Sequence, residues 1–332
     1  MNVLVVRLGA LGDIVHAIPA VAAIRHAHPD ARIHWLVEQR HRAVVDLVTP
    51  VDRVIVLERP SFGAWLSVTR EMRTMAYDVA IDFQGLLKSA VLARASGAAR
   101  VVGFSIWHLR EKSARPFYSS SAPGEGRHVI RKNLALLRAL GIDDDEIRFP
   151  IAPVTSPILD GLAQRLDGRP FAIVNPGAAW PNKRWPAQCF GELCAFLRDA
   201  AGLVPVVVWG PGEERLADAV SASSSNTAVL APPTSVPDLV AMCRAATLVV
   251  SGDTGPLHIA TAAGTPTVSV FGPTDPARNG PWGDRDIAVS RFDRCACHYD
   301  RKCHARRWCL EDVTVAEVSA AVQQRLAGRS RG

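Results

Sequence analysis

The feature that most constrains the fold is a repeated alternation between short apolar runs and helical segments. Near-continuous apolar runs, which are typical of buried parallel strands, occur in the first half at 2–7, 32–37, 53–57, 79–82 and 100–103. Helical patterns lie between them at 14–28, 66–75 and 87–96, and another follows at 128–140. This alternation predicts a doubly wound parallel sheet with helices on both faces.

The second half repeats the same alternation. Expected strands lie at 171–175, 204–209, 248–251 and 267–271, and expected helices at 186–200, 213–222, 236–245, 254–263 and 314–326. A chain of 332 residues exceeds the usual single core, so we expect two α/β domains. The proline-rich segment 141–157 is interpreted as the linker between a domain at 1–150 and a domain at 151–332. Two such domains facing each other make a deep cleft, where we expect the site.

Charge and composition limit the classes of ligand and partner that this chain is expected to bind. The formal net charge is +6, which suits anionic ligands or acidic membrane surfaces. The arginines are spread along the chain, so we do not expect nucleic acid as a partner. The opening apolar run at 2–6 is too short for a secretory signal, and no apolar stretch reaches the length of a membrane span. We therefore expect a cytoplasmic protein with at most peripheral membrane contact, and a long functional or mobile loop at 104–127.

The most informative motif is the run Ser251-Gly252-Asp253-Thr254-Gly255-Pro256-Leu257-His258. An apolar strand leads into a glycine-rich turn, and Asp253 or Thr254 can cap the helix that follows. A helix start offers free N–H groups and partial positive charge, which suit a phosphate. An ordinary capped helix is the alternative interpretation, and His258 taken alone is more typical of a structural histidine.

A second phosphate-binding candidate is the loop Asn175-Pro176-Gly177, which follows another strand end. Lys183 and Arg184 come shortly before a helix, where they can reach the same diphosphate. The alternative is that both are solvated basic residues next to Trp185, which would serve as a packing anchor.

Two loops of the first half carry candidate residues for the other side of the cleft. The segment Leu8–Asp13 has the spacing G-x-x-G and lacks the dinucleotide fingerprint G-x-G-x-x-G. Asp13 begins a helix, so it is either a helix cap or a general base, and His16 lies one turn further on. At the end of the strand at 79–82 and just after it, Asp82, Gln84 and Lys88 either line the other wall of the cleft or are solvated loop residues.

A late group of cysteines has the spacing C-x-C-x5-C-x5-C, formed by Cys295, Cys297, Cys303 and Cys309. Zinc sites usually pair C-x-x-C units, so this spacing resembles a metal site only loosely, even with His298 and His304 nearby. We expect packing or incidental thiols here and no metal.

Taken together, these segments resemble the ADP-heptose:lipopolysaccharide heptosyltransferases, which are inverting glycosyltransferases of GT-B fold with two Rossmann-like domains. The resemblance spans nearly the whole chain. It is carried by Arg7–His16, Asp82–Ala90, Pro176-Gly177, Lys183–Pro186, Trp209–Glu213, Ser251–His258 and Gly272–Pro276. The segment Asp82–Ser89 is most similar to the first heptosyltransferase, and the Pro176–Pro186 region is similar to the second enzyme as well.

The resemblance implies a role for each candidate residue. Asp13 would be the base that deprotonates the acceptor hydroxyl, and Lys183 would stabilise the departing diphosphate. Donor contacts are implied for Pro176, Gly177, Glu213 (or its neighbour Glu214, at the ribose), Asp253, Thr254, Gly255 and His258. Acceptor contacts are expected for Gly12, His16, Gln84, Lys88 and Arg110. The first domain would then bind the acceptor and the second the nucleotide sugar.

The implied reaction moves L-glycero-D-manno-heptose from ADP-heptose to the anionic Kdo-lipid A core. It would proceed without cofactor or metal, in a monomer at the cytoplasmic face of the inner membrane. No Asp-x-Asp metal motif lies in the candidate phosphate-binding loops, and Lys183 with a helix dipole can neutralise the diphosphate instead. The alternatives are an enzyme like heptosyltransferase II, another nucleotide-sugar transferase or epimerase, and a non-catalytic nucleotide-binding protein. A dinucleotide oxidoreductase is disfavoured because the fingerprint is missing.

Overall fold

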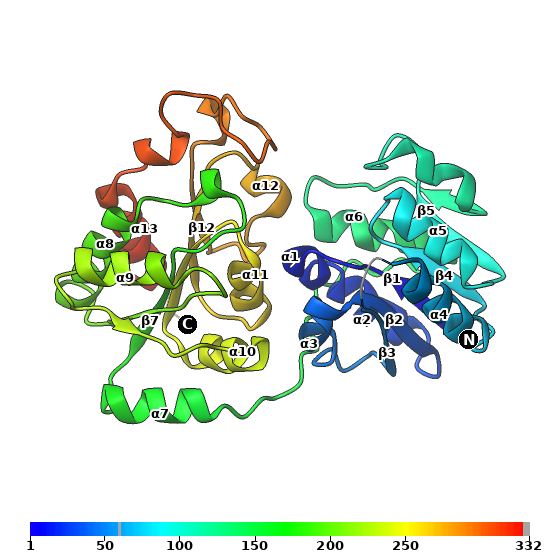
Figure 1. The fold of residues 1–332 in the computed structure, drawn as a ribbon, viewed down its shortest axis with the longest axis horizontal. Coiled ribbons are helices and arrows are strands. Elements are labelled where there is room, and N and C mark those ends of the chain that lie inside the picture. Colours follow the sequence, from blue (N-terminus) through cyan, green and yellow to red (C-terminus); the bar gives the residue numbers. More distant parts are fainter. Residues whose placement is uncertain (59–60, 328–332) are drawn as a thin grey trace. The chain divides into compact units, whose positions relative to one another are not determined.

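Each half of the chain forms a six-stranded parallel sheet, and both sheets have the same strand order. Strands and helices alternate along both halves of the chain (Figure 1). The computed structural model describes residues 1–58 and 61–327. The chain divides between Ala152 and Pro153 into two compact units, two residues beyond the boundary expected from the linker composition. Each unit is described by itself.

The first unit has the strand order β3-β2-β1-β4-β5-β6. Its strands are β1 (Asn2–Val6), β2 (Arg32–Glu38), β3 (Arg53–Leu57), β4 (Val79–Asp82), β5 (Arg100–Phe104) and β6 (Ser120–Ala122). Its helices are α1 (Leu11–Val15), α2 (Ile18–Ala27), α3 (Arg42–Val45), α4 (Phe62–Arg73), α5 (Leu87–Ala95) and α6 (Val129–Leu136), with 3-10 turns η1 (Gln39–His41), η2 (Lys112–Phe117) and η3 (Leu137–Leu140). Helix α2 packs on α6, and α4 packs on α5.

The second unit has the order β12-β11-β10-β7-β8-β9, which is the same topology read from the other edge. Its strands are β7 (Phe171–Asn175), β8 (Val204–Val207), β9 (Val229–Leu230), β10 (Leu248–Gly252), β11 (Thr267–Phe271) and β12 (Ile287–Ser290). Its helices are α7 (Pro157–Leu166), α8 (Ala187–Asp199), α9 (Glu214–Ser223), α10 (Val236–Ala245), α11 (Gly255–Ala262), α12 (Pro276–Asn279) and α13 (Val315–Ala327), with 3-10 turns η4 (Pro181–Lys183), η5 (Phe292–Arg294) and η6 (Cys309–Asp312). Helix α8 packs on α9 and α13, and α10 packs on α7 and α11.

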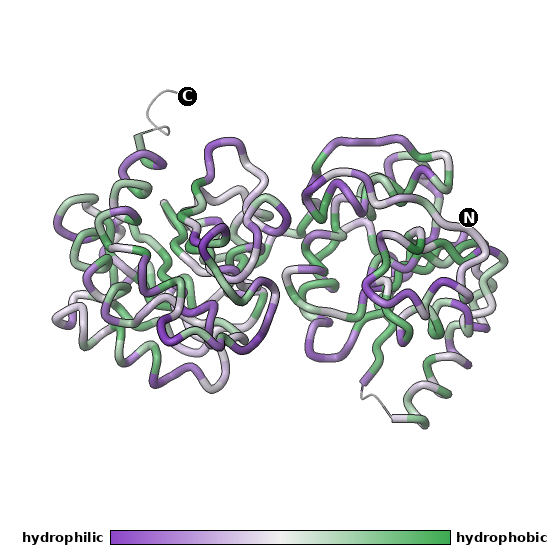
Figure 2. Tube along the Cα trace, turned by 90° about the horizontal axis from the view of Figure 1, so that it is seen from above, coloured by the Kyte–Doolittle hydropathy of each residue, from purple (hydrophilic) through white to green (hydrophobic). Residues whose placement is uncertain are grey.

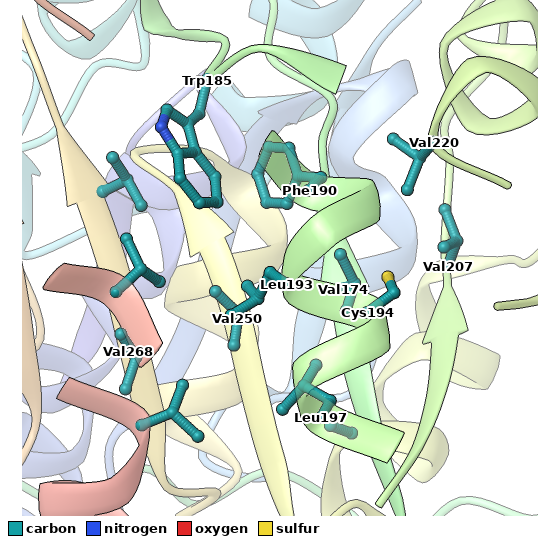
Figure 3. Packing of buried hydrophobic residues seen from close by; sticks show 14 of the residues in the cluster. Val174, Trp185, Phe190, Leu193, Cys194, Leu197, Val207, Val220, Val250 and Val268 are labelled. Atoms are coloured by element: carbon teal, nitrogen blue, oxygen red, sulfur yellow. The ribbon is translucent and has the colours of Figure 1, made fainter. Parts of the chain in front are cut away.

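Burial explains why the central strands read as continuous apolar runs. Strands β7 and β10 are buried along their whole length because helices cover both faces of the sheet. One face packs its valines against α8 and a Trp185–Phe190 pair, whose rings meet edge to face at 4.9 Å (Figure 3). Hydrophobic and hydrophilic stretches alternate along the trace in both units (Figure 2).

The sequence-based element boundaries need three corrections. The single helix expected at 14–28 is two helices, α1 and α2, because Pro19 in the first turn of α2 cannot continue a helix from the preceding residues. The expected long loop at 104–127 contains η2 and the short strand β6. Strands β9 and β12 were not expected, since both are short, half-buried edge strands with a weak apolar signal.

Candidate active site

The site in the second unit lies where the strand order of its sheet reverses. Strands β7 and β10 are neighbours, with Asn175 in register with Ser251. From this point the chain winds outward in opposite directions, and ligands of such sheets bind outside the carboxyl ends of the strands at this position. Asn175 Nδ2 donates to Ser251 Oγ at 2.9 Å and to Thr254 Oγ1 at 3.0 Å. These bonds tie the loop containing Pro176 and Gly177 to the start of α11.

Asp253 lies at the centre of a polar cluster at this edge. Its Oδ2 is 2.5 Å from Lys183 Nζ and accepts a 2.7 Å hydrogen bond from the Thr274 hydroxyl. Its Oδ1 is 3.4 Å from His258 Nε2. Burial raises the pKa of Asp253, but the hydrogen bond from His258 and the positive charge of Lys183 outweigh it and hold the pKa well below its usual range. Asp253 is therefore a buried anion whose two oxygens position three partners.

Lys183 is held by its packing as well as by its charge. Its ammonium lies 4.4 Å from the centre of the Trp180 ring, and the side chain is 14% exposed. Trp185, two residues on, is buried in the core and donates its indole N–H to Val313 O at 2.9 Å. Trp185 is thus a packing anchor, as the alternative interpretation of this segment expected. The same anchor fixes the backbone that carries Lys183. An ammonium has three N–H donors, so contact with Asp253 leaves donors for a second anion.

Helix α11 begins beside this ammonium. Thr254 occupies the N-cap position in an extended conformation but makes no side-chain capping hydrogen bond, and Pro256 lies in the first turn. The Thr254 hydroxyl is instead bonded to Asn175. The first N–H groups of a helix have no partner within the helix and carry the positive end of its dipole. A helix start next to Lys183 is therefore a suitable place for a phosphate.

The two adjacent glutamates, Glu213 and Glu214, differ sharply in position. Glu213 Oε2 accepts a hydrogen bond from Gly210 N at 3.1 Å, and its Oε1 lies 3.6 Å from Arg184 Nη2. A Cβ at Gly177 would lie 2.0 Å from Glu213 Oε2, so only glycine lets this carboxylate lie over the β7 loop. Glu214 is exposed and bonds to the Gly212 backbone. Of the two, Glu213 is the one at the strand ends.

Arg184 does not join Lys183 in the polar cluster. Its Nε donates to Ala178 O at 2.8 Å, and its guanidinium turns toward Glu213. The two adjacent basic residues therefore serve different parts of the same edge, and the expectation that both reach one diphosphate is not supported by their contacts.

A second polar site occupies the equivalent position in the first unit, where β1 and β4 are neighbours. Arg7 Nη2 lies 2.5 Å from Asp13 Oδ2, and Arg7 Nη1 donates to Phe83 O at 2.6 Å. The Leu8 amide donates to Gln84 Oε1 at 2.8 Å. The buried arginine thus orients Asp13, whose side chain is 32% exposed and open to a ligand.

Asp82 organises the β4 loop from inside the fold. Its carboxylate accepts hydrogen bonds from the hydroxyls of Ser89 (2.8 Å) and Tyr118 (2.6 Å) and from the backbone of Gln84 (2.8 Å). Complete burial raises the pKa of Asp82, and these bonds partly offset the rise. Asp82 therefore shapes the loop and does not line a surface, contrary to the wall position expected for it.

The remaining candidates of the first unit are dispersed. Gly12 lies in the first turn of α1, close to Asp13. His16 is buried, and its ring packs edge-on against His128 at 5.4 Å. Lys88 is exposed and bonds Glu38 at 2.9 Å, and Arg110 is exposed in the loop before η2. Asp13, Gln84 and Gly12 thus lie around one switch point, and His16 lies inside the unit.

Several residues of the two sites carried no assigned role in the sequence interpretation. Thr274 belongs to the segment Gly272–Pro276 between β11 and α12. Nothing in the spacing of this segment shows that the Thr274 hydroxyl donates to Asp253. Arg7 ends the first apolar run and is buried. Because arginine is rarely buried unless it is paired, an arginine at this position is a sequence signal for a buried ion pair with a nearby carboxylate. Trp180 gave no signal, because its ring meets Lys183 only through the bend at η4.

The four late cysteines lie in the segment between β12 and α13 as two thiol pairs. Within residues 1–58 and 61–327, no group of three or more His, Cys, Asp or Glu side chains is arranged to hold a metal ion. Over the same residues, no helix is long and apolar enough to cross a bilayer.

Comparison with known proteins assigns the family. Residues 65–309 match the model of glycosyltransferase family 9 (heptosyltransferase). The chain belongs to this glycosyltransferase family. This family 9 chain is 30% identical over 318 residues to lipopolysaccharide heptosyltransferase 1 of Pseudomonas aeruginosa, covering 91% of this chain and 87% of that protein. It is 29% identical over 300 residues to the protein of the same name from Escherichia coli K12, covering 86% and 92%. The predicted family and transferase class are confirmed.

Solved structures of the family have the same fold. The E. coli heptosyltransferase WaaC with ADP superposes with a TM-score of 0.79 at 23% identity, covering 98% of this chain and all of that one. E. coli ADP-heptose lps heptosyltransferase II gives a TM-score of 0.79 at 19% identity, covering 99% and 100%. These likenesses confirm the predicted GT-B fold with two Rossmann-like domains.

Proposed function

We propose that this family 9 glycosyltransferase transfers L-glycero-D-manno-heptose from ADP-heptose to the Kdo-lipid A inner core, with inversion at the anomeric carbon. The observation that carries the proposal is the Lys183–Asp253 ion pair beside the start of α11. It joins a cation to a helix N-terminus at the switch point of a nucleotide-binding type of sheet. The names of the relatives from P. aeruginosa and E. coli support the assignment to lipopolysaccharide synthesis.

The second unit would bind the donor. A family member has been solved with ADP and also with ADP-2-deoxy-2-fluoro heptose, which supports an ADP-sugar here. The diphosphate would lie on the α11 start at Thr254 and Gly255, next to Pro176 and Gly177, since these loops present backbone N–H groups and little side-chain bulk. Glu213, which is hydrogen bonded to the Gly210 amide and faces Gly177, would accept hydrogen bonds from the ribose hydroxyls.

Lys183 would stabilise the negative charge that develops as ADP departs. A fixed cation at the leaving oxygen strengthens its interaction in the transition state, when the charge grows. Asp253 would act by holding Lys183, His258 and Thr274 in place, because direct contact between its buried carboxylate and a phosphate would be repulsive. With this cation and helix dipole in place, we propose that the reaction needs no metal and no cofactor.

Asp13 in the first unit would act as the general base. Its carboxylate is partly exposed, and its ion pair with Arg7 fixes its direction. In a single displacement the acceptor hydroxyl gives its proton to Asp13 while its oxygen bonds to the anomeric carbon and the bond to ADP breaks, which inverts the configuration. Gly12, Gln84, Lys88, Arg110 and His16 remain the proposed acceptor residues, and only the first four lie at the strand ends or on exposed loops.

The place and form of action are also part of the proposal. The acceptor is an anionic lipid, and the net charge of +6 favours approach to an anionic membrane surface. We therefore propose a monomer that works at the cytoplasmic face of the inner membrane by peripheral contact.

The test is incubation with ADP-heptose and Kdo-bearing lipid A, with the products read by mass spectrometry. Transfer of one heptose, lost in a Lys183→Met variant and largely retained in Lys183→Arg, is the expected result. Anomeric configuration of the product is then read by NMR. Turnover with a UDP-sugar in place of ADP-heptose would remove the donor assignment. Transfer only to an acceptor that already carries one heptose would favour the second-heptosyltransferase alternative.

A further inference from the structure

The two cysteine pairs between β12 and α13 have no part in the proposed sugar transfer. Cys297 Sγ lies 3.1 Å from Cys303 Sγ, and the Cys309 thiol is hydrogen bonded to Cys295. The spacing in the sequence, one short gap followed by two equal longer gaps, does not show which thiols meet. The folded chain decides this and pairs residues six and fourteen positions apart.

The two pairs differ in their surroundings. Cys297 is hydrogen bonded to the Cys303 thiol and accepts hydrogen bonds from the backbone N–H groups of His304 and Ala305, and these contacts lower the pKa of Cys297. Burial, followed by the hydrogen bond to Cys295, raises the pKa of Cys309 to about 12. Each pair has one buried thiol, Cys297 or Cys295, and one partly exposed thiol, Cys303 or Cys309. The Cys297–Cys303 pair is therefore distinguished by the 3.1 Å approach of its sulfurs and by the N–H groups directed at Cys297.

The short loop closed by this pair touches the segment that carries Lys183. Asn182 Nδ2 donates to Asp300 O at 2.9 Å. The Arg301 guanidinium lies 5.7 Å from the centre of the Trp180 ring, the same ring that lies under the Lys183 ammonium. Two consecutive loop residues, Asp300 and Arg301, thus contact the segment that carries Lys183.

The same loop also contacts the strand-end loop that holds Asp253. The Tyr299 amide donates to Pro273 O at 2.8 Å, and the next residue, Thr274, bonds the Asp253 carboxylate. A change in the freedom of the loop from Cys297 to Cys303 therefore reaches both members of the Lys183–Asp253 pair within a few contacts.

We propose that Cys297 and Cys303 form a reversible disulfide, and that this redox modification site sets the order of the loop that supports the donor-binding residues. The effect on donor binding rests on the function proposed above, but formation of the disulfide does not. A bond needs the sulfurs at about 2.0 Å, so the pair has to close by roughly 1 Å. A turn of the partly exposed Cys303 side chain supplies such a movement.

The oxidant is a low-molecular-weight disulfide such as oxidised glutathione. The Cys303 thiol loses its proton to solvent and attacks one sulfur of the small disulfide, which leaves a mixed disulfide on Cys303 and releases one glutathione thiolate that takes up a proton. Cys297 then loses its proton, attacks the Cys303 sulfur and expels the second glutathione as a thiolate, which takes up a proton in turn. The two protein thiols lose two protons and two electrons in all, and the small disulfide leaves as two thiols.

Peptide mapping by mass spectrometry after treatment of the full chain with oxidised glutathione tests the proposal. A Cys297–Cys303 linkage that dithiothreitol reverses is expected, with Cys295 and Cys309 still free. The linkage disappears in Cys303→Ser and persists in the control Cys189→Ser, which removes a half-buried thiol on α8. A Cys295–Cys309 linkage in its place, no linkage at all, or a stoichiometric metal ion that protects all four thiols would overturn the proposal.

Calorimetric titration with ADP measures the consequence. Ordering the loop before the ligand arrives lowers the entropic cost of binding, so the oxidised protein is expected to bind ADP about three- to tenfold more tightly than the reduced one. Cys303→Ser shows no such response to oxidant. Equal affinity in both forms would refute the control of donor binding. No ADP binding in either form would count against the proposed function while the linkage itself stands.

Discussion

Replacing Asp253 by asparagine removes the charge that holds the donor-side cluster together. The Asp253 side chain is 5% exposed and Lys183 is 14% exposed, so the variant leaves an ammonium nearly buried without its partner. Breaking a buried ion pair costs about 3–5 kcal/mol, and the remaining exposure of Lys183 and its contact with Trp180 place the expected loss near the lower end, at about 3 kcal/mol at pH 7.

The loss of unfolding free energy in Asp253→Asn should become smaller as the pH falls. The pKa of Asp253 is below its usual range in the folded protein, so the folded state binds this proton less tightly than the unfolded state. Its contribution is fully present above the pKa of an unfolded aspartate, about 3.9, and declines as the pH falls toward the folded value. The difference between parent and variant is therefore flat above about pH 5 and narrows below about pH 4.

Urea unfolding followed by tryptophan fluorescence at several pH values measures both quantities. The matched control is Asp312→Asn, which makes the same chemical change in an exposed ion pair with Arg307 in the same unit. Its free energy of unfolding should change by less than about 1 kcal/mol. An Asp253→Asn variant as stable as this control at pH 7, or a deficit that does not change down to pH 3.5, would refute the assignment of Asp253 as the charged centre of the cluster.

Three further predictions concern the reaction. Asp13→Asn should lower kcat about 10²- to 10⁴-fold with ADP affinity unchanged, because it removes the base and not a donor contact; a parent-like kcat would exclude Asp13 as the base. Glu213→Gln should weaken ADP binding about tenfold, through the loss of a charged hydrogen-bond acceptor, whereas Glu214→Gln should bind like the parent by calorimetry; the reverse order would move the ribose contact to Glu214. Transfer should persist in excess EDTA, because Lys183 supplies the cation, and activity lost to EDTA and restored by a divalent ion would show that a metal takes part.

Much of the fold follows from the sequence because its signals are local. Strands β7 and β10 are buried on both faces, so their side chains are apolar almost without interruption, and the strand–helix alternation is visible without coordinates. The short edge strands β6, β9 and β12 escape such reasoning, since an edge strand of two to four half-buried residues has neither the length nor the burial that produces a pattern.

The candidate site also has one part that the sequence predicts and another that only the folded chain reveals. A strand followed by Gly252, Asp253 and a helix start is contiguous in the chain, so the sequence alone determines that an anion-binding helix terminus exists there. Which side chains meet at that terminus depends on loops from different strands. Lys183 reaches Asp253 across 70 positions of sequence. Thr274 reaches it from the far end of β11.

The choice between Glu213 and Glu214 also required the tertiary structure. Both side chains follow the same turn, and only the absence of a Cβ at Gly177 shows which carboxylate fits over the neighbouring loop. The sequence by itself determined the two parallel sheets and the position of the helix start at residues 253–255, because burial and backbone geometry impose local patterns. The partners of Asp253, the orientation of Asp13 by Arg7 and the pairing of the cysteines were decided only by the fold, since side chains distant in sequence meet only when strands and loops are assembled.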